Sequence, residues 1–324
     1  MPVMSYADAA KLAVAEAMRE DPTVWCVGED LGRGGVFKQY TGLVEEFGPQ
    51  RISDAPISEA AIMGAAFGAA MAGTRPIVEM RFADFALCAT DELVNQIAKA
   101  RFMFGGQSRA PMVIRKPMGM WRSSAAQHSQ SLESWYTHIP GLVVCCPATP
   151  QDNYSMMKAA IACDDPVVYL EHKNIWALEG EVDTTKTVDF GKAALRRSGR
   201  DVTLVSWSHT ANLCVEAADA LARQGIGAEV IDLRSLWPWD KAAVFDSVRK
   251  TGRLLVAHEA VSVAGFGAEV VATVAQNIPM KTLPKRLGSP RGLIAYAPNL
   301  EDQMRVTAPM IAKAAEDMME NEPA

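Results

Sequence analysis

The chain has 324 residues, of which 49% are hydrophobic and 22% are charged, and its formal net charge is −6. This length allows two domains, each with a core of its own. The acidic balance and the absence of a long basic run argue against nucleic acid or an anionic membrane as a partner.

The first residues, "MPVMSYADAAKLAVAEAMRED", predict an amphipathic helix that contains acids, unlike a signal or transit peptide. The longest uncharged apolar run, 60–73, is too short to span a bilayer. Six cysteines without regular spacing are typical of a reducing compartment. We therefore expect a cytoplasmic protein that does not enter a membrane.

Apolar strands and helices alternate in the first half of the chain. Thr90 is a predicted helix cap, and Thr149 is another, followed by Pro150 and by Asp152 in a capping box. Strands that are apolar throughout and separated by helices indicate a parallel sheet covered on both faces. The predicted strands are 23–30, 76–82, 111–117, 142–147 and 166–172, and the predicted helices are 90–104 and 149–165.

The polar stretch 174–192 breaks this pattern and predicts a linker, after which the alternation restarts. The sequence therefore predicts an α/β fold of two domains, 1–185 and 186–324, each a mainly parallel sheet with helices on both faces. The predicted strands of the second domain are 201–208, 228–235 and 253–260, and its predicted helices are 210–225, 241–252 and 265–277.

Several catalytic motifs are absent from the sequence, namely GxxxxGK[ST], HExxH, GxSxG and CxxC. The five histidines lack the spacing of zinc ligands, and "GFGAEV" at 265–270 lacks the third glycine of a dinucleotide site. We interpret that glycine pair as packing at a helix start. We interpret Cys145 and Cys146 as core residues of a strand.

Ligands of such folds bind beyond the carboxyl ends of the strands. The loops at these ends are 28–35, 54–59, 81–85 and 116–131, and each combines glycine, charged or aromatic residues. Glu59 is conspicuous because it stands alone at the head of the uncharged run 60–73. By itself it could be a helix-capping acid or a functional carboxylate.

Four segments resemble the beta subunits of thiamine-diphosphate-dependent dehydrogenases, the first components of pyruvate, branched-chain 2-oxo acid and acetoin dehydrogenase complexes. They are "GEDLGRGGVF", "DAPISEAAIMGAAFGAAMAGTRPIVEMRFADF", "NQIAKARFMFGG" and "AAQHSQSLESWYTHIPGL". The resemblance runs from about residue 5 to about residue 309 and weakens after residue 284. It implies a thiamine pyrimidine-binding domain followed by a transketolase C-terminal-like domain.

The resemblance also implies site residues. Glu59 matches the glutamate that hydrogen-bonds the aminopyrimidine and drives it into its imino form, so that it can deprotonate the thiazolium carbon. His128 matches a histidine of proton transfer and of the handover to lipoamide. The other implied cofactor-binding residues are Glu29, Ile57, Ser58, Ala60, Arg81 and Phe85. Backbone carbonyls that match a potassium site of some relatives belong to Met112, Ala160, Ile161, Cys163 and Asp165.

The sequence has no GDG motif, the part of a thiamine enzyme that holds the diphosphate through Mg²⁺. The resemblance therefore implies an alpha subunit that supplies this half, an α2β2 heterotetramer and a lipoyl acyltransferase core as partners. The implied reaction cleaves acetoin or a pyruvate-like 2-oxo acid and reductively acylates lipoamide. Half of a split transketolase-like enzyme and a non-catalytic α/β assembly subunit remain as alternatives.

Overall fold

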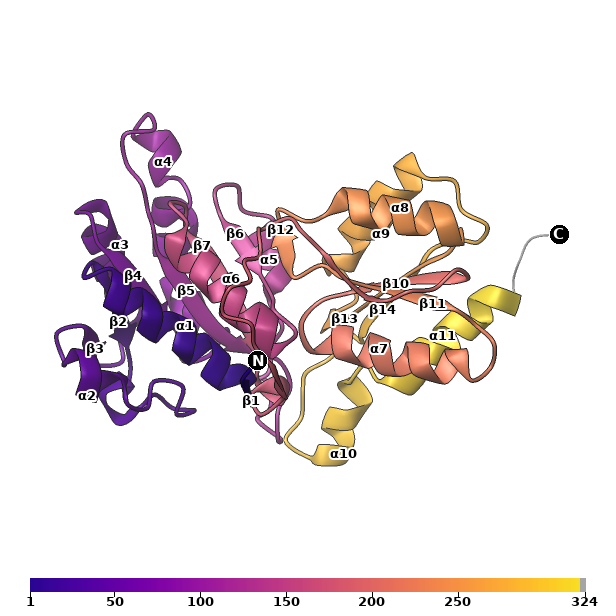
Figure 1. Cartoon of the computed structure of the whole chain (residues 1–324), viewed down its shortest axis with the longest axis horizontal. Coiled ribbons are helices and arrows are strands. Elements are labelled where there is room, and N and C mark those ends of the chain that lie inside the picture. Colours follow the sequence, from indigo (N-terminus) through magenta and orange to yellow (C-terminus); the bar gives the residue numbers. More distant parts are fainter. Residues whose placement is uncertain (321–324) are drawn as a thin grey trace. The chain divides into compact units, whose positions relative to one another are not determined.

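The computed structural model describes Met1–Glu320, and the chain divides into two compact units (Figure 1). The first unit contains Met1–Met118 and Trp135–Phe190, and the second contains Gly119–Ser134 and the chain from Gly191 onward. The predicted domain boundary after residue 185 lies close to the division at Phe190. The prediction did not anticipate that 119–134 belongs to the second unit.

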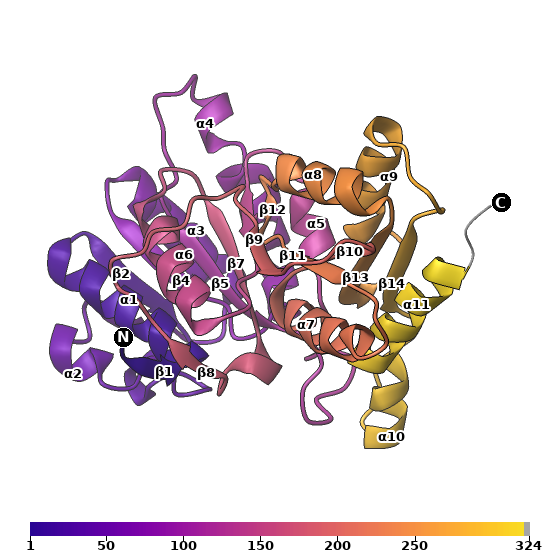
Figure 2. The same ribbon diagram turned by 45° about the vertical axis from the view of Figure 1, so that its right-hand side comes forward.

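A parallel sheet in the strand order β6-β7-β5-β4-β2-β3 forms the centre of the first unit. The helices α1 (Tyr6–Glu20) and α6 (Pro150–Ala162) pack together in front of this sheet in Figure 2 and share its apolar core. The helix α3 (Glu59–Met71) packs beside β4. The strands are β2 (Val24–Gly28), β3 (Ile52–Asp54), β4 (Arg75–Glu79), β5 (Val113–Met118), β6 (Val143–Cys145) and β7 (Val167–His172).

The second unit has a five-stranded sheet in the order β14-β13-β10-β11-β9, parallel except for the edge strand β9. In Figure 1, α8 and α9 lie on one side of this sheet and α7 and α11 on the other. The predicted α/β class of two mainly parallel, helix-covered sheets is therefore confirmed. The strands are β9 (Ala194–Arg197), β10 (Val202–Ser206), β11 (Ala228–Asp232), β13 (Leu254–Val261) and β14 (Lys285–Ser289). The helices are α7 (Ser208–Ala222), α8 (Lys241–Thr251), α9 (Gly267–Asn277), α10 (Pro298–Glu301) and α11 (Ala308–Glu320).

The predicted amphipathic helix at the start of the chain is confirmed as α1, but it begins only at Tyr6. The residues before it form β1 (Val3–Ser5), which pairs with β8 (Glu179–Glu181) as antiparallel strands. The Ser5 Oγ accepts a hydrogen bond from Asp8 N at 3.1 Å and so caps α1. The predicted linker 174–192 therefore contains a strand, whose partner lies at the far end of the sequence.

The predicted single helix 90–104 is wrong. The chain forms a 3-10 turn, Phe85–Ala89, then a π-helical stretch, Glu92–Ile97, and then α4 (Ala100–Met103). Thr90 has helical dihedral angles, and its Oγ1 donates to Leu87 O at 2.6 Å. Because the backbone is already helical before Thr90, the side chain bonds backward instead of capping a new helix.

The prediction for α6 is confirmed at its first turn. Thr149 is the N-cap and its Oγ1 accepts from Asp152 N at 3.0 Å, while Pro150 is the first helical residue. The Asp152 carboxylate accepts in turn from the Thr149 hydroxyl at 2.7 Å. Cys145 and Cys146 are fully buried, as expected of core residues. Within Met1–Glu320, none of the helices is both long and apolar enough to cross a membrane.

Candidate active site

The strands β4, β2 and β3 are neighbours and run parallel, so their carboxyl ends lie at one edge of the sheet. Glu29 follows β2, the loop 55–58 follows β3, and Arg81 follows β4. The predicted site residues of the first unit are therefore brought to a common edge by the sheet itself.

Glu59 is the first residue of α3 and is half-buried. The Ser58 Oγ before it donates to Pro56 O at 3.0 Å and makes no capping bond. Across the described residues, Met1–Glu320, the structure contains no hydrogen bond or ion pair to the Glu59 carboxylate. The amino-terminal end of a helix favours a negative charge, so Glu59 is an ionisable acceptor without a donor of its own.

Aromatic rings form a wall that starts at Phe85. The 3-10 turn that begins at Phe85 packs against α3. The rings of Phe85 and Phe82 meet edge-on at 5.2 Å, and Phe82 meets Phe37 edge-on at 5.6 Å. Phe37 in turn contacts Trp176 at 4.6 Å. Such a wall suits a flat, weakly polar ligand ring.

Arg81 forms an ion pair with acids of the same edge. Its Nη1 lies 3.3 Å from Glu29 Oε2 and its Nη2 lies 3.6 Å from Asp30 Oδ2. Glu29 is only 8% exposed, so its charge is compensated inside the loop cluster. The structure thus brings together two residues that the sequence named separately.

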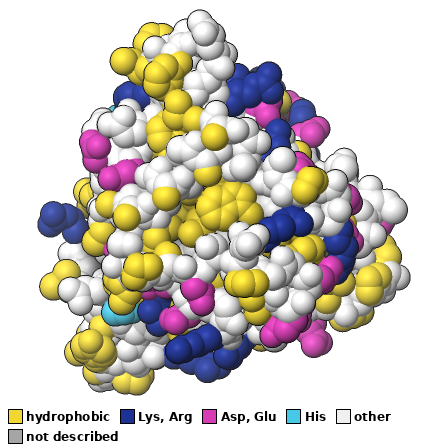
Figure 3. All heavy atoms as spheres, turned by 90° about the vertical axis from the view of Figure 1, so that its left-hand side faces the viewer, with side chains coloured by type: hydrophobic (Ala, Val, Ile, Leu, Met, Phe, Trp, Pro, Cys, Tyr) yellow, Lys and Arg dark blue, Asp and Glu magenta, His cyan; other side chains and the backbone are white. Residues whose placement is uncertain are grey.

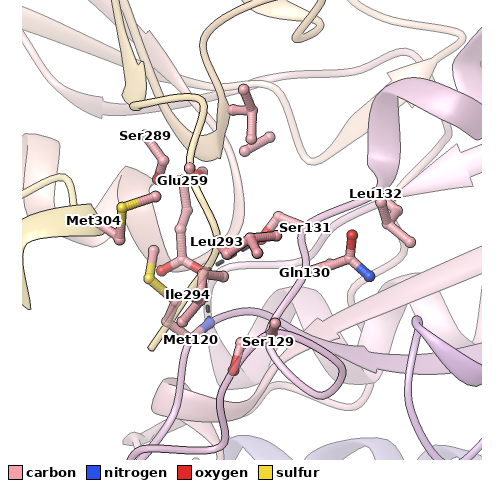
Figure 4. A pocket seen from close by; sticks show the side chains of 14 residues that line it. Met120, Ser129, Gln130, Ser131, Leu132, Glu259, Ser289, Leu293, Ile294 and Met304 are labelled. Atoms are coloured by element: carbon pink, nitrogen blue, oxygen red, sulfur yellow. Dashed lines mark hydrogen bonds between the residues drawn. The ribbon is translucent and has the colours of Figure 1, made fainter. Parts of the chain in front are cut away.

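His128 belongs to the second unit, within the segment Gly119–Ser134. Glu259, on β13, accepts hydrogen bonds from this segment through Oε1, from Met120 N at 2.8 Å and from Ser131 Oγ at 3.2 Å (Figure 4). Glu301 Oε2 accepts from Ser123 N at 2.8 Å. The sequence reasoning missed both acids, although Glu259 is visible as a charged residue inside the apolar run "RLLVAHEA".

Residues 3–177 match the family profile "Transketolase, pyrimidine binding domain", and residues 191–311 match "Transketolase, C-terminal domain". The chain is 38% identical to the 2-oxoisovalerate dehydrogenase subunit beta of Bacillus subtilis, over 99% of this chain and 100% of the relative. It is 41% identical to the acetoin:2,6-dichlorophenolindophenol oxidoreductase subunit beta of Cupriavidus necator, over 95% and 96%. The chain belongs to the family of dehydrogenase beta subunits.

This family extends to the pyruvate dehydrogenase E1 component subunit beta-1, mitochondrial, of Arabidopsis thaliana, which is 39% identical over 95% of this chain and 86% of the relative. A split gene transketolase, described as an inactive beta4 tetramer, has the same fold with a TM-score of 0.83 over 99% of both chains. Its sequence identity is only 22%. The alternative of a transketolase half is therefore less favoured than a dehydrogenase beta subunit.

The glycine pair of this beta subunit at "GFGAEV" serves packing. A Cβ at Gly265 would lie 2.6 Å from His258 Cε1, and a Cβ at Gly267 would lie 2.8 Å from His258 Cδ2. The His258 ring also stacks on Trp207, with ring centroids 5.2 Å apart. Burial lowers the pKa of His258 to about 4, so the glycines make room for a neutral imidazole, in agreement with the interpretation from the sequence.

Two of the five carbonyls predicted to hold potassium accept hydrogen bonds from an arginine side chain. Arg75 Nη1 donates to Ile161 O at 3.1 Å and to Cys163 O at 3.0 Å, and its Nη2 pairs with Asp164 Oδ1 at 2.8 Å. Arg101 Nε pairs with Asp165 Oδ1 at 2.6 Å. Met112 O accepts from Val167 N, and Ala160 O accepts from Cys163 N. A guanidinium thus already occupies part of this donor set, which fits potassium poorly; the ion stays a prediction and no step of the function depends on it.

The sequence reasoning also missed a buried ionic network behind the site edge. Arg115 on β5 donates from Nε and Nη2 to the Glu171 carboxylate of β7, and Asn153 Nδ2 donates to Glu171 Oε1 at 3.0 Å. Tyr40 donates to Glu79 Oε2 at 2.9 Å. Burial, above all, raises the pKa of Glu79 to about 7. The available signal was the presence of charged residues, Glu79, Arg115 and Glu171, inside three mainly apolar strands.

Proposed function

We propose that this chain binds the aminopyrimidine of thiamine diphosphate and, with an alpha subunit, cleaves acetoin or a 2-oxo acid and transfers the acyl group to lipoamide. The observation that carries the proposal is the Glu59 carboxylate at the start of α3, which has no donor among the described residues and lies on an element packed against the Phe85 turn. An unpaired acceptor beside an aromatic wall fits an aromatic ring that carries an N–H.

Glu59 is the proposed trigger of the reaction. Thiamine diphosphate, when bound, supplies a nucleophilic carbon at the thiazolium ring. Glu59 would accept a hydrogen bond from a protonated nitrogen of the pyrimidine and thereby favour the imino form of its amino group. The helix end stabilises the carboxylate that this role requires.

Neighbouring residues are proposed to bind the rings. Phe85 would pack on the pyrimidine, and Ile57, Ser58 and Ala60 would line the wall around Glu59. Ile57 is 75% exposed, so its side chain is available for such a contact. Glu29, with its partner Arg81, would lie toward the reacting end of the cofactor.

His128 is proposed to move a proton during the handover to lipoamide. Histidine side chains give and take protons close to neutral pH. In the overall exchange, a 2-oxo acid and the lipoyl disulfide yield carbon dioxide and an acyl dihydrolipoyl thioester, so one sulfur gains the acyl group and the other a proton. His128 would supply this second proton.

An alpha subunit is proposed to hold the diphosphate and its Mg²⁺, in an α2β2 assembly bound to a lipoyl acyltransferase core. The sequence lacks the GDG motif for that task. The surface offers apolar area for a partner: Phe102, Met103 and Phe104 around α4 are 87%, 70% and 51% exposed. In the face shown in Figure 3, hydrophobic side chains gather at the top, where α4 lies. Large exposed apolar patches mark protein contacts.

The names of the relatives indicate a class of substrates and not one compound. The relatives are named for 2-oxoisovalerate, acetoin and pyruvate dehydrogenases at similar identity. We propose acetoin or a pyruvate-like 2-oxo acid, which an assay of the assembled enzyme with each substrate would decide.

The variant Glu59→Gln tests the proposal. A neutral amide cannot favour the imino form, so turnover of the α–β assembly at saturating cofactor should fall by about 10²–10⁴-fold, with the fold and the assembly kept. Glu45→Gln is the matched control, because Glu45 is an exposed acid in the first turn of α2 (Leu43–Phe47). Turnover close to normal in Glu59→Gln would refute the role. A wild-type assembly without any thiamine-dependent turnover would support a non-catalytic subunit instead.

A further inference from the structure

The segment Gly119–Ser134, which carries His128, has an unfavourable backbone. Arg122, Ser123 and Ala125 have φ angles of 45°, 58° and 59°. Residues with a β-carbon seldom adopt this left-handed conformation. It persists only where the surroundings impose it, so the contacts of the segment decide where His128 is held.

The second half of the segment is incompletely packed on the side shown in Figure 4. A cavity of about 100 Å³ borders 129–132 and is also lined by Leu293, Ile294 and Met304. Ser129, next to His128, is 1% exposed, and its Oγ has no hydrogen-bond partner within the described part of the chain. The second half of the segment therefore has room to shift on this side, and its hydrogen bonds restrain it there.

Glu259 supplies such bonds at both flanks of His128. One carboxylate oxygen, Oε1, accepts from Met120 N at 2.8 Å on one side and from Ser131 Oγ at 3.2 Å on the other. The backbone carbonyl of Glu259 accepts from Ser289 Oγ, which ties it to β14.

Two other acids also bond to or within the segment. Glu301 accepts from Ser123 N at 2.8 Å and is itself paired with Arg305 Nη2 at 2.7 Å. Glu133 accepts from Trp207 Nε1 at 3.0 Å. Glu259 bridges the residues before and after His128.

We propose that Glu259 is a positioning residue for His128, acting through its two bonds to Met120 and Ser131. Its carboxylate closes the strained segment into a loop and fixes the backbone from which the imidazole projects. The inference rests on the proposed role of His128 in the handover to lipoamide. It predicts that removal of the Glu259 side-chain oxygens loosens the segment and slows the handover.

The first test measures amide hydrogen exchange in the α–β assembly. In Glu259→Ala, exchange in 119–134 should accelerate at least tenfold, with no change in β10 and β11. Glu259→Gln should stay within twofold of the wild type, because its amide oxygen can still accept both bonds. Glu216→Ala, which removes an exposed acid of α7, is the control for loss of charge. If Glu259→Ala does not fold, Ser131→Ala removes one of the two bonds and should accelerate exchange near residue 131.

The second test compares two activities of the same variants. The ratio compared is the handover rate to a lipoyl domain divided by the rate with a small artificial electron acceptor. In Glu259→Ala this ratio should fall at least tenfold, and in Glu259→Gln it should return to the wild-type value. Unchanged exchange in Glu259→Ala and Ser131→Ala would overturn the proposal, as would equal losses of the ratio in Glu259→Ala and Glu259→Gln. A normal ratio in His128→Ala would instead overturn the proposed role of His128, while the exchange measurement would still decide whether Glu259 holds the segment.

Discussion

Lys116, on β5, is fully buried beside the site edge. Its Nζ lies 3.9 Å from the centroid of the Tyr136 ring and has no hydrogen-bond acceptor within the described residues. Burial lowers the pKa of Lys116 well below the ordinary value of 10.5. The folded chain therefore binds this proton less readily than the unfolded chain does.

Lys116→Met should stabilise the protein, because it replaces a buried amine by an apolar chain of similar length. The gain in the free energy of unfolding should be about 1–3 kcal/mol at pH 7, the typical cost of an unsatisfied buried donor. At pH values between the lowered pKa of Lys116 and 10.5, the unfolded state binds more protons than the folded state. The free energy of unfolding of the wild type should therefore rise with pH in this range, and the advantage of Lys116→Met over the wild type should shrink. Urea titrations at several pH values measure this, with the exposed Lys186→Met as control. A destabilised Lys116→Met would show that the amine has a structural partner.

At the residue scale, local signals predicted best. Glu59 at a helix start and Thr149 as a cap follow from neighbours within a few residues. Glu259 and Glu301 could not be recognised in this way, because their partners Met120 and Ser123 are 139 and 178 residues away in sequence. Only the tertiary fold creates those bonds.

At the scale of elements, α6 depends on its first turn. Thr149→Ala removes the acceptor of the Asp152 amide and should lower the free energy of unfolding by about 0.5–2 kcal/mol. Thr149→Ser keeps the hydroxyl and should lie close to the wild type. Urea denaturation followed by circular dichroism measures both variants. Equal stability of Thr149→Ala and the wild type would mean that packing of α6 against α1 alone fixes the start of this helix.

The element that the sequence misrepresented is 85–104. Its apolar residues have helical spacing, which predicts one helix. The structure changes pitch from 3-10 to π to α along this stretch, and both the 3-10 turn and the π-helical stretch pack on α3. The spacing of apolar residues predicts which face of a helix is buried, but it does not predict local changes of helical pitch. The β1–β8 pair was missed for a related reason, since Val3 pairs with Glu181.

At the scale of the whole molecule, the lone chain should bind thiamine diphosphate weakly or not at all with Mg²⁺ present. The sequence has no GDG motif to bind the diphosphate half of the cofactor. The aromatic wall and the Glu59 carboxylate offer only a few contacts to the pyrimidine half. Adding the alpha subunit should restore binding and convert the lone chain to an α2β2 assembly. Calorimetric titration and sedimentation measure the two effects.

Thiamine without the diphosphate serves as the control ligand and should bind weakly in both cases. Tight, Mg²⁺-dependent binding to the lone chain would contradict the division of the cofactor between two subunits.

The chain passes from the first unit to the second at Gly119, returns at Trp135 and leaves again at Gly191. No single crossover between two genes can therefore exchange one unit intact. A recombinant joined at codon 190 would combine the His128 segment of one parent with Glu259 and Glu301 from the other. Such a hybrid would keep the hydrogen bonds from Met120 N and Ser123 N only if the parent that supplies residues 191–324 encodes acceptors at positions 259 and 301.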